Sequence, residues 1–327
     1  VIWKPVTFFA DSINTVTNDF WRDHHGNLPG GITDTIYRNA PIGINVADPQ
    51  YTIHSLGRYS IMDVYNNFLN GPTGYNGTSG VNNTIVGSNN ANSVSINANS
   101  NAIFGQENLY TSAGGNYNLL VGVQNTYSAT TASYNTNVGY QNYYAALTPN
   151  YNTGFGYQNF YASDGDYNFA SGGKNYYSGT GSISYNFGSG LENFMMLTSG
   201  NYNMGNGRDN YHSLTSGSYD FGNGYQNFYT LGSGSYNFAN GAYNMYSATS
   251  TNYNFLNGAY NFYSNLTGSA NFGNGNRNFY YTTTGTTNFG SGSYNFEQNT
   301  TGSYNFGTGV NNFKAHTGSY NFANGAN

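Results

Sequence analysis

Side chains able to do acid–base chemistry are rare in this chain of 327 residues, and in its repetitive part only two acids lie close together. Asp164 and Asp166 are separated by a single glycine. Glycoside hydrolysis uses two carboxylates that flank the scissile bond, about 5 to 9.5 Å apart. The two aspartates fall in a loop sequence, so we interpret them as a solvated turn and expect no catalytic pair there.

A metal site is the second chemical candidate. The sequence Asp-His-His at 23–25 offers ligands that suit a transition metal, and a three-fold axis could complete the site from three chains. Adjacent residues usually point in different directions, so we interpret His24 and His25 as surface loop residues. Glu107 and Glu192 are isolated from other acids. We therefore expect no catalytic residue, no metal and no cofactor.

The composition excludes several classes of protein. Only 8 basic and 13 acidic residues are present, which is 6% of the chain and gives a net charge of −5. Nucleic-acid binding needs a basic face, so we expect no nucleic-acid partner. Cysteine is absent, which excludes disulfides and thiolate metal sites. No run of 18 apolar residues occurs, so we expect no membrane insertion.

A repeat of 17 residues organises most of the chain. Its anchor, usually the Tyr of a Tyr-Asn pair, recurs 16 times with a mean spacing of 17.0 residues, and no interval differs from 17 by more than one. The anchors are residues 65, 82, 100, 117, 134, 151, 167, 185, 202, 219, 236, 253, 270, 287, 304 and 320. A disordered low-complexity tract would let this spacing drift, so each copy must occupy an equivalent place in a stack.

Individual positions of the repeat are strongly biased. Counting the anchor as position 0, position 1 is Asn in 15 of 16 copies, position 5 is Gly in 15 of 16, and position 8 is Asn in 14 of 15 complete copies. Asp220 is the exception at position 1. Aromatic residues recur at positions 2, 9 and 10. Gly and Asn are poor helix formers, so the consensus favours β structure over helix.

These biases predict an all-β fold, a parallel β-solenoid or β-roll of 17-residue coils with strands at positions 0–3 and 8–11. Stacked Asn amides form hydrogen-bonded ladders along such an axis, and Gly at position 5 would supply the corner between the strands. The predicted ladder residues are Asn118, Asn135, Asn152, Asn168, Asn186, Asn203, Asn237, Asn254, Asn125, Asn142, Asn159, Asn175, Asn193, Asn210, Asn227 and Asn244. The predicted turn residues are Gly122, Gly139, Gly156, Gly172, Gly190, Gly207, Gly224 and Gly241.

The aromatic residues point to partners. Rings at positions 2, 9 and 10 of nearly every coil exceed what a thin solenoid can bury, so we expect an exposed aromatic face and a homotrimer as the closed assembly. Exposed Tyr and Asn also suit carbohydrate, because rings stack on sugar faces and amides bond hydroxyl groups. The candidates for surface binding are Tyr144, Tyr161, Tyr177, Tyr229, Tyr246 and Tyr263, together with Tyr211 and Tyr281.

Two segments resemble known families. Residues 134–144 (YNTNVGYQNYY) and 151–161 (YNTGFGYQNFY) resemble the repeats of phage tail-fibre proteins and of trimeric autotransporter adhesin heads. Residues 33–58 (TDTIYRNAPIGINVADPQYTIHSLGR) resemble an element that commonly precedes such repeats in tail fibres. The resemblance implies a left-handed β-roll assembled as a trimer. The departures are Ala40-Pro41 and Asn45-Val46 in the upstream element, and a coil of 17 residues where adhesin heads have about 14.

The resemblance and the composition together predict three regions. Residues 1–64 form a connecting or capping region, in which 36–44 and 51–56 alternate enough to be strands. Residues 65–116 form a transition zone of degenerate coils, and 117–327 form the regular repeats. Tail fibres of this kind often end in a chaperone domain that is cleaved off, whereas this sequence stops inside a coil. We therefore interpret the chain as a segment of a longer fibre.

The leading hypothesis for function is a structural and adhesive fibre of a phage or phage-like tail, located in the virion tail and outside the cell. Its predicted partners are further copies of itself, other tail or fibre proteins through the N-terminal region, and a host surface glycan or protein. One alternative is a bacterial trimeric surface adhesin with the same fold. A second alternative is a tailspike that degrades polysaccharide, for which Asp164 and Asp166 would be the catalytic candidates.

Overall fold

The computed structural model describes residues 42–44, 53–55, 60–62, 68–70, 81–91, 98–110, 115–146, 148–179, 183–282, 284–298 and 301–326. The chain divides into two units, Val1–Val64 and Tyr65–Asn327. The first unit contains β1 (Ile42–Ile44), β2 (Ile53–Ser55) and β3 (Ser60–Met62), and β1 pairs with β2 in parallel. His24 and His25 lie outside the described residues, so the interpretation of 23–25 stays a prediction.

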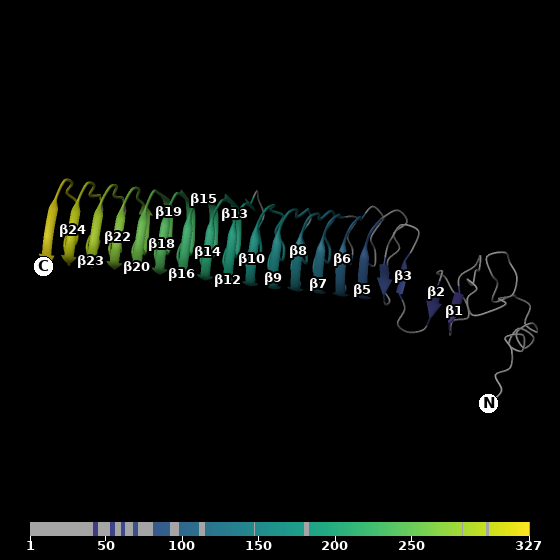
Figure 1. The fold of residues 1–327 in the computed structure, drawn as a ribbon. Coiled ribbons are helices and arrows are strands. Elements are labelled where there is room, and N and C mark those ends of the chain that lie inside the picture. Colours follow the sequence, from purple (N-terminus) through teal and green to yellow (C-terminus); the bar gives the residue numbers. More distant parts are fainter. Residues whose placement is uncertain are drawn as a thin grey trace, which may run out of the picture. The chain divides into compact units, whose positions relative to one another are not determined.

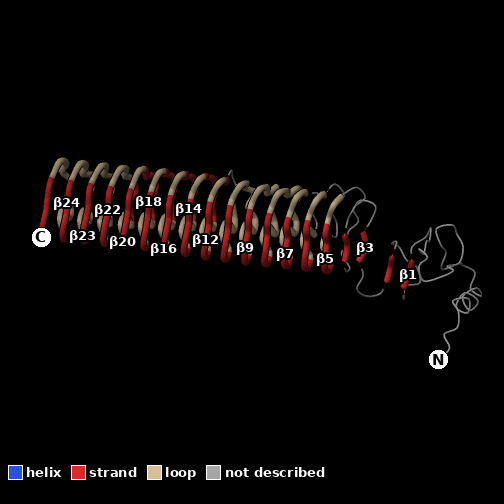
Figure 2. The backbone as a smooth tube through the Cα atoms, in the orientation of Figure 1, coloured by secondary structure: helices blue, strands red, loops and turns tan. Residues whose placement is uncertain are grey.

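The second unit is a parallel β-solenoid of about 17 residues per turn, with one strand of its main sheet in every coil (Figures 1 and 2). The strands of this sheet are β4 (Phe68–Asn70), β5 (Thr84–Ser88), β6 (Ala102–Gln106), β7 (Leu119–Val123), β8 (Thr136–Tyr140), β9 (Thr153–Tyr157), β10 (Phe169–Gly173), β12 (Phe187–Leu191), β14 (Met204–Arg208), β16 (Phe221–Tyr225), β18 (Phe238–Ala242), β20 (Phe255–Ala259), β22 (Phe272–Asn276), β23 (Phe289–Ser293), β24 (Phe306–Val310) and β25 (Phe322–Ala326). The prediction of an all-β parallel solenoid with a 17-residue coil is confirmed.

A second, shorter sheet forms where the return segment of the coil is also extended. Its strands are β11 (Ile183–Ser184), β13 (Met196–Asn201), β15 (Ser213–Ser218), β17 (Thr230–Ser235), β19 (Ser247–Asn252) and β21 (Ser264–Thr267). In both sheets each residue pairs with the residue one repeat away, as in Phe238 with Phe255 and Leu214 with Leu231. Equivalent repeat positions of successive coils therefore lie in line with one another and form columns parallel to the axis.

The predicted strand boundaries are wrong. The strands occupy positions 2–6 and 11–16, and the segments predicted as strands at 0–1 and 8–10 are bends. The backbone turns because alternate non-glycine residues adopt left-handed conformations, as at Tyr236 (position 0, φ 62°), Tyr243 (position 7, φ 56°) and Met245 (position 9, φ 51°). Aromatic residues are typical of strands, so their presence at these positions led to the prediction of strands where the chain bends.

The glycine at position 5 lies inside the main strand and does not form a corner between two strands. Its φ falls between +107° and +133° in every coil from Gly87 to Gly325. In all but the last of these coils, a Cβ at this glycine would approach the carbonyl oxygen of the equivalent glycine in the next coil to between 1.8 and 2.1 Å. A residue with a side chain thus fails here for two reasons, its conformation and the close packing of neighbouring backbones.

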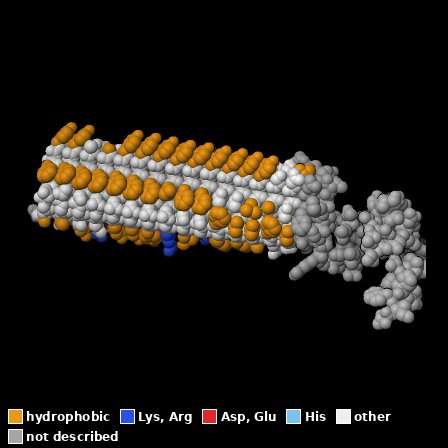
Figure 3. All heavy atoms as spheres, viewed as in Figure 1, with side chains coloured by type: hydrophobic (Ala, Val, Ile, Leu, Met, Phe, Trp, Pro, Cys, Tyr) orange, Lys and Arg blue, Asp and Glu red, His pale blue; other side chains and the backbone are white. Residues whose placement is uncertain are grey.

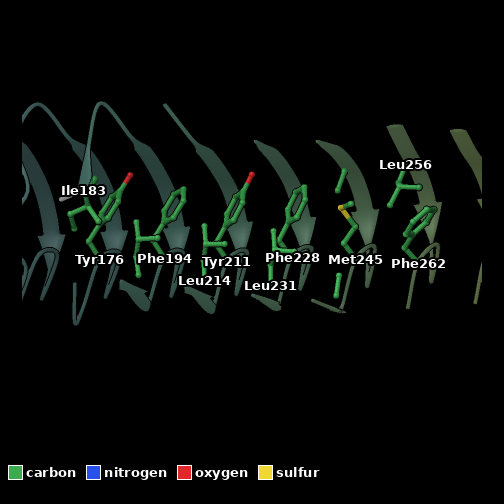
Figure 4. Packing of buried hydrophobic residues seen from close by; sticks show 14 of the residues in the cluster. Tyr176, Ile183, Phe194, Tyr211, Leu214, Phe228, Leu231, Met245, Leu256 and Phe262 are labelled. Carbon is green, nitrogen blue, oxygen red and sulfur yellow. The ribbon is translucent and has the colours of Figure 1, made fainter. Parts of the chain in front are cut away.

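The hydrophobic core runs along the solenoid axis as rows of stacked side chains, and Figure 4 shows ten labelled residues of the larger of its two clusters. It is built mainly from positions 3, 9 and 12, and Leu197, Leu214 and Leu231 represent position 12. The sizes at positions 3 and 9 are complementary between neighbouring coils: Ile103 at position 3 follows Ala91 at position 9 of the preceding coil, whereas Gly188 follows Tyr176. The rings at position 9, which were expected to contribute to an exposed face, are therefore core residues, because the interior of each coil is wide enough for one ring.

This size complementarity gives a testable prediction. A Cβ at Gly188 would lie 2.9 Å from Cε2 of Tyr176 in the preceding coil, so Gly188→Leu should destabilise the solenoid by about 1 to 3 kcal/mol. The natural chain contains Leu at the equivalent position, Leu256, where the preceding coil carries Met245. We expect Tyr176→Met to restore most of the lost stability in the double variant, measured by thermal unfolding. Equal destabilisation with and without Tyr176→Met would contradict this packing rule.

Candidate binding surfaces of the solenoid

The asparagines at position 8 form a continuous ladder inside the coil. Asn227 is representative: its backbone N–H donates to Oδ1 of Asn210 at 3.1 Å, and its Nδ2 donates to the carbonyls of Asn223 at 2.8 Å and Gly241 at 3.0 Å. All members of this ladder from Asn90 to Asn312 are buried. Their hydrogen-bonding groups are therefore used within the chain and face no ligand.

The asparagines at position 1 form a second buried ladder. The Nδ2 of Asn254 donates to Oδ1 of Asn237 and to the carbonyl of Gly268, both at 3.0 Å, and its backbone N–H donates to the same Oδ1 at 3.1 Å. Each member thus bridges one coil to the next and also ties the end of its own repeat to its beginning. The two ladders satisfy backbone groups at the bends, where no strand partner is available.

Asp220 interrupts the position 1 ladder. Its Oδ1 accepts hydrogen bonds from the backbone N–H and Nδ2 of Asn237 at 2.8 and 3.0 Å, as an asparagine oxygen would. Its Oδ2 is buried and has no hydrogen-bond partner among the described residues. Burial raises the pKa of this carboxyl from its ordinary value of 3.8 to about 7, while the hydrogen bonds from Asn237 act in the opposite direction.

The surroundings of Oδ2 favour the protonated form of Asp220. A Cβ built on Gly217 would lie 2.5 Å from the carbonyl oxygen of Gly234 and 2.9 Å from Oδ2 of Asp220. One coil earlier, the corresponding atoms are the carbonyl oxygen of Gly217 and Nδ2 of Asn203, which are hydrogen-bonded at 2.8 Å. Oδ2 therefore occupies the place of an amide donor that faces a carbonyl. A protonated carboxyl matches that place, and an ionised one does not.

The outer surface carries a column of tyrosines at position 0. Their rings stack with centroids 4.6 to 5.1 Å apart, and Tyr236 is 51% exposed. The members are Tyr117, Tyr134, Tyr151, Tyr167, Tyr185, Tyr202, Tyr219, Tyr236 and Tyr253, with Tyr304 and Tyr320 after a gap at Ala270 and Thr287. Figure 3 shows hydrophobic side chains in rows parallel to the axis.

A second column of rings and an asparagine ladder lie on the outer face of the main sheet. Phe221, Phe238 and Phe255 at position 2 stack at 4.7 to 4.9 Å. Beside them, Asn at position 4 is hydrogen-bonded along the axis from Asn206 to Asn274, with Nδ2 to Oδ1 distances of 2.7 to 3.0 Å. This ladder was not predicted, although Asn recurs at position 4 in consecutive repeats of the sequence, as in Asn206, Asn223 and Asn240.

The tyrosines predicted to bind a ligand at position 10 form a third stacked column. Tyr144, Tyr161, Tyr177, Tyr229, Tyr246 and Tyr263 are all partly exposed, and neighbouring rings lie 4.9 to 5.1 Å apart wherever two of them are adjacent. Tyr281 is 47% exposed. Tyr211, in contrast, is completely buried at position 9, so the prediction of a surface role for Tyr211 is wrong. The tyrosines alternate between core and surface because the backbone bends there.

The acidic pair has structural partners. Oδ1 of Asp164 accepts the backbone N–H of Thr148 at 3.1 Å, and Oδ1 of Asp166 accepts the backbone N–H of Asn150 at 2.9 Å. Both carboxylates thus hold the preceding coil, as the Asn ladders do elsewhere. Within the part of the chain that the structure describes, no group of three or more His, Asp or Glu side chains could hold a metal ion.

Membrane crossing by a helix has no support in the described residues, because no helix among them is long and apolar enough to span a bilayer.

In comparisons with known proteins, no family model, no curated protein and no solved structure matches this chain. The surfaces described above are therefore the basis for assigning a function.

Proposed function

We propose that this chain is a structural and adhesive segment of a phage or phage-like tail fibre, a left-handed β-roll assembled as a homotrimeric rod that attaches to a host-cell surface without catalysis. The observation that carries the proposal is the set of outer aromatic columns, which repeat in register with the backbone along the solenoid. A stalk needs stiffness and reach, and both follow from stacking identical coils.

Self-assembly is supported by the columns at positions 0 and 2. Side chains such as Tyr236 (51% exposed) and Phe255 (40% exposed) leave extended apolar surface in contact with water. A partner that covers the whole length must repeat at the same interval of about 4.8 Å along the axis. A second copy of this chain meets that requirement in every coil, and a three-fold arrangement closes the assembly.

Attachment is supported by the column at position 10, which the proposed trimer interface at positions 0 and 2 does not use. Partly exposed tyrosines at position 10 provide rings for stacking and hydroxyl groups for hydrogen bonds, a combination that suits polysaccharide. The carboxylates of Asp164 and Asp166 bond the backbone of the preceding coil, which favours attachment over hydrolysis. The N-terminal region would join the rod to the remainder of the tail.

The assembly is tested by replacing two phenylalanines of the outer face. Phe238→Thr with Phe255→Thr should leave the coil intact, because Thr136 and Thr153 occupy the same position in earlier coils. Each change should remove about 2 kcal/mol of burial per chain at the interface. We expect sedimentation equilibrium to show three chains for the unaltered protein and dissociation for the double variant at micromolar concentration. An unaltered protein that sediments as a monomer at this concentration would overturn the trimer.

A further inference from the structure

The column at position 7 changes its character over one stretch of the solenoid. In the earlier coils it carries hydrogen-bonded polar residues, as in Gln124, Gln141 and Gln158, whose side chains are linked at 2.7 to 2.8 Å. From Tyr243 onward it reads Tyr243, Tyr260, Arg277 and Tyr294. A feature that serves only coil stacking recurs in every coil, whereas a binding site is needed in one place. This local change therefore marks a candidate site.

Arg277 also differs from the other cations of the described solenoid. Lys174 lies 4.0 Å from Glu192, Arg208 lies 3.4 Å from Asp209, and Lys314 lies 3.3 Å from Glu297. No carboxylate of the described residues lies within 4.0 Å of the Arg277 guanidinium. Among the described residues, its side chain donates one hydrogen bond, to the hydroxyl of Tyr294, and this bond is long, at 3.5 Å.

Tyrosine rings surround this guanidinium. Its carbon lies 5.7 Å from the ring centroid of Tyr260, 5.1 Å from that of Tyr280 and 5.3 Å from that of Tyr294. Contacts of this kind hold a guanidinium in place without neutralising its charge. Tyr281 packs edge-on against Tyr280 at 4.4 Å and is 47% exposed. The result is a fixed positive charge, beside partly exposed rings, on a chain whose net charge is −5.

The ring network extends over the neighbouring coils. Tyr243 stacks on Tyr260 at 4.8 Å, and Tyr260 tilts against Tyr263 at 5.5 Å, which joins the columns at positions 7 and 10. Tyr263 in turn stacks on Tyr280 at 5.0 Å. The network thus offers ring faces and edges over consecutive coils spaced by about 4.8 Å. A linear chain of sugar rings could engage it along the axis.

We propose that Arg277 and the surrounding Tyr243, Tyr260, Tyr263, Tyr280, Tyr281 and Tyr294 bind an acidic glycan, with the guanidinium holding the carboxylate of a uronic-acid residue and the tyrosines contacting the sugar rings. Arginine presents a planar fork of N–H donors that matches a carboxylate in a bidentate arrangement. Tyrosine gives rigid contact area at a low entropic cost. The inference rests on the proposed attachment function and specifies its ligand class and its place.

The test uses the complete chain and titration calorimetry. Alginate oligosaccharides are the carboxylated probe, dextran sulfate oligosaccharides are the sulfated probe without carboxylate, and dextran oligosaccharides are the neutral probe. Arg277→Gln should lower the affinity for alginate about tenfold or more, the loss expected for one charge-assisted bidentate contact. Glutamine is accepted at this position, since Gln158 and Gln226 occupy it in other coils. Lys174→Gln is the matched control, because Lys174 occupies the same repeat position and is a cation paired with Glu192. We expect this variant to change the affinity for alginate less than twofold.

Each outcome decides between possibilities. Loss of alginate binding in Arg277→Gln alone supports the site, and stronger binding of dextran sulfate than of alginate would overturn the carboxylate as the recognised group. Equal effects of Arg277→Gln and Lys174→Gln would show that only net charge matters and would overturn the site. Binding of the chain to cells that survives both protease treatment of those cells and Arg277→Gln would leave the attachment function standing and overturn this site. Binding that is abolished by the protease would identify a protein receptor and overturn the glycan.

Discussion

Gly172→Ala is expected to break the solenoid at β10 and to cost about 4 kcal/mol or more. The backbone at Gly172 has a φ of +113°, which residues with a Cβ rarely adopt. The added carbon would lie 2.0 Å from the carbonyl oxygen of Gly190 in the next coil. Neither strand can move aside, because the coils on both sides pair in the same register.

The adjacent residue provides the control for this prediction. Gly173 does not have a positive φ. A Cβ there would lie 3.3 Å from Cδ1 of Leu191, the flexible end of a side chain, and at an ordinary 3.9 Å from the carbonyl oxygen of Tyr157. Alanine occurs naturally at the equivalent position, as Ala242 and Ala259. Gly173→Ala should therefore change the melting temperature little, whereas Gly172→Ala should lower it and speed amide hydrogen exchange in β9, β10 and β12. Similar melting temperatures for the two variants would refute the packing argument.

Asp220→Asn is expected to stabilise the solenoid and to remove most of the pH dependence of its stability. The pKa of Asp220 is about 7 in the folded chain against an ordinary value of 3.8, because burial disfavours the carboxylate. Between these two values the folded state binds more protons than the unfolded state, so the free energy of unfolding falls as the pH rises. Above about pH 7 both states are ionised and the full penalty, roughly 4 kcal/mol, is present.

The asparagine variant should gain in two ways at pH 8. It carries no buried charge, and its Nδ2 can donate to the carbonyl of Gly234, as Nδ2 of Asn203 donates to Gly217. The groups that face Asp220 are Asn203, Asn237 and the buried hydroxyl of Tyr211, so no cation compensates the carboxylate. Stabilisation should therefore be largest at pH 8 and smaller at pH 5.

Thermal unfolding between pH 4 and pH 9 measures this difference. Gly173→Ala serves as the control, because it alters no titratable group and should keep the pH dependence of the parent chain. Hydrogen exchange can localise the effect, since the coils around β16 and β18 should open first at high pH in the parent chain. A parent chain whose stability does not change from pH 5 to pH 8 would contradict a protonated Asp220.

The recurrence of residues shows how far sequence reasoning reaches for this fold. The 17-residue period predicted the parallel solenoid, because a stack of equivalent coils is what preserves spacing over so many copies. Asn at positions 1 and 8 was assigned to ladders, and the structure places these side chains in buried hydrogen-bonded chains. Stacking also explains the scarcity of charge: like charges repeated at about 4.8 Å would repel one another.

The same reasoning failed where local conformation mattered. Tyr236 and Phe228 look alike in a repeat, yet Tyr236 is about half exposed and Phe228 is fully buried. The difference arises from residues in the left-handed conformation between the strands, which reverse the direction of successive side chains. Aromatic residue types give no sign of this conformation in the sequence. For this reason Tyr211 was assigned to the surface, and the strands were placed at positions 0–3 and 8–11.

For the candidate sites too, the sequence predicted some features and the tertiary structure decided the others. The sequence by itself determined the period, the parallel stacking and the identity of the ladders, since each depends only on which residues recur. The tertiary structure decided which rings are buried and which form outer columns, and it placed Oδ2 of Asp220 against a carbonyl where neighbouring coils have an amide. It also placed Arg277 among tyrosines of three coils, with no carboxylate of the described residues within 4.0 Å. Those features depend on the direction of each side chain and on contacts between residues 17 positions apart, which only the closed coil brings together.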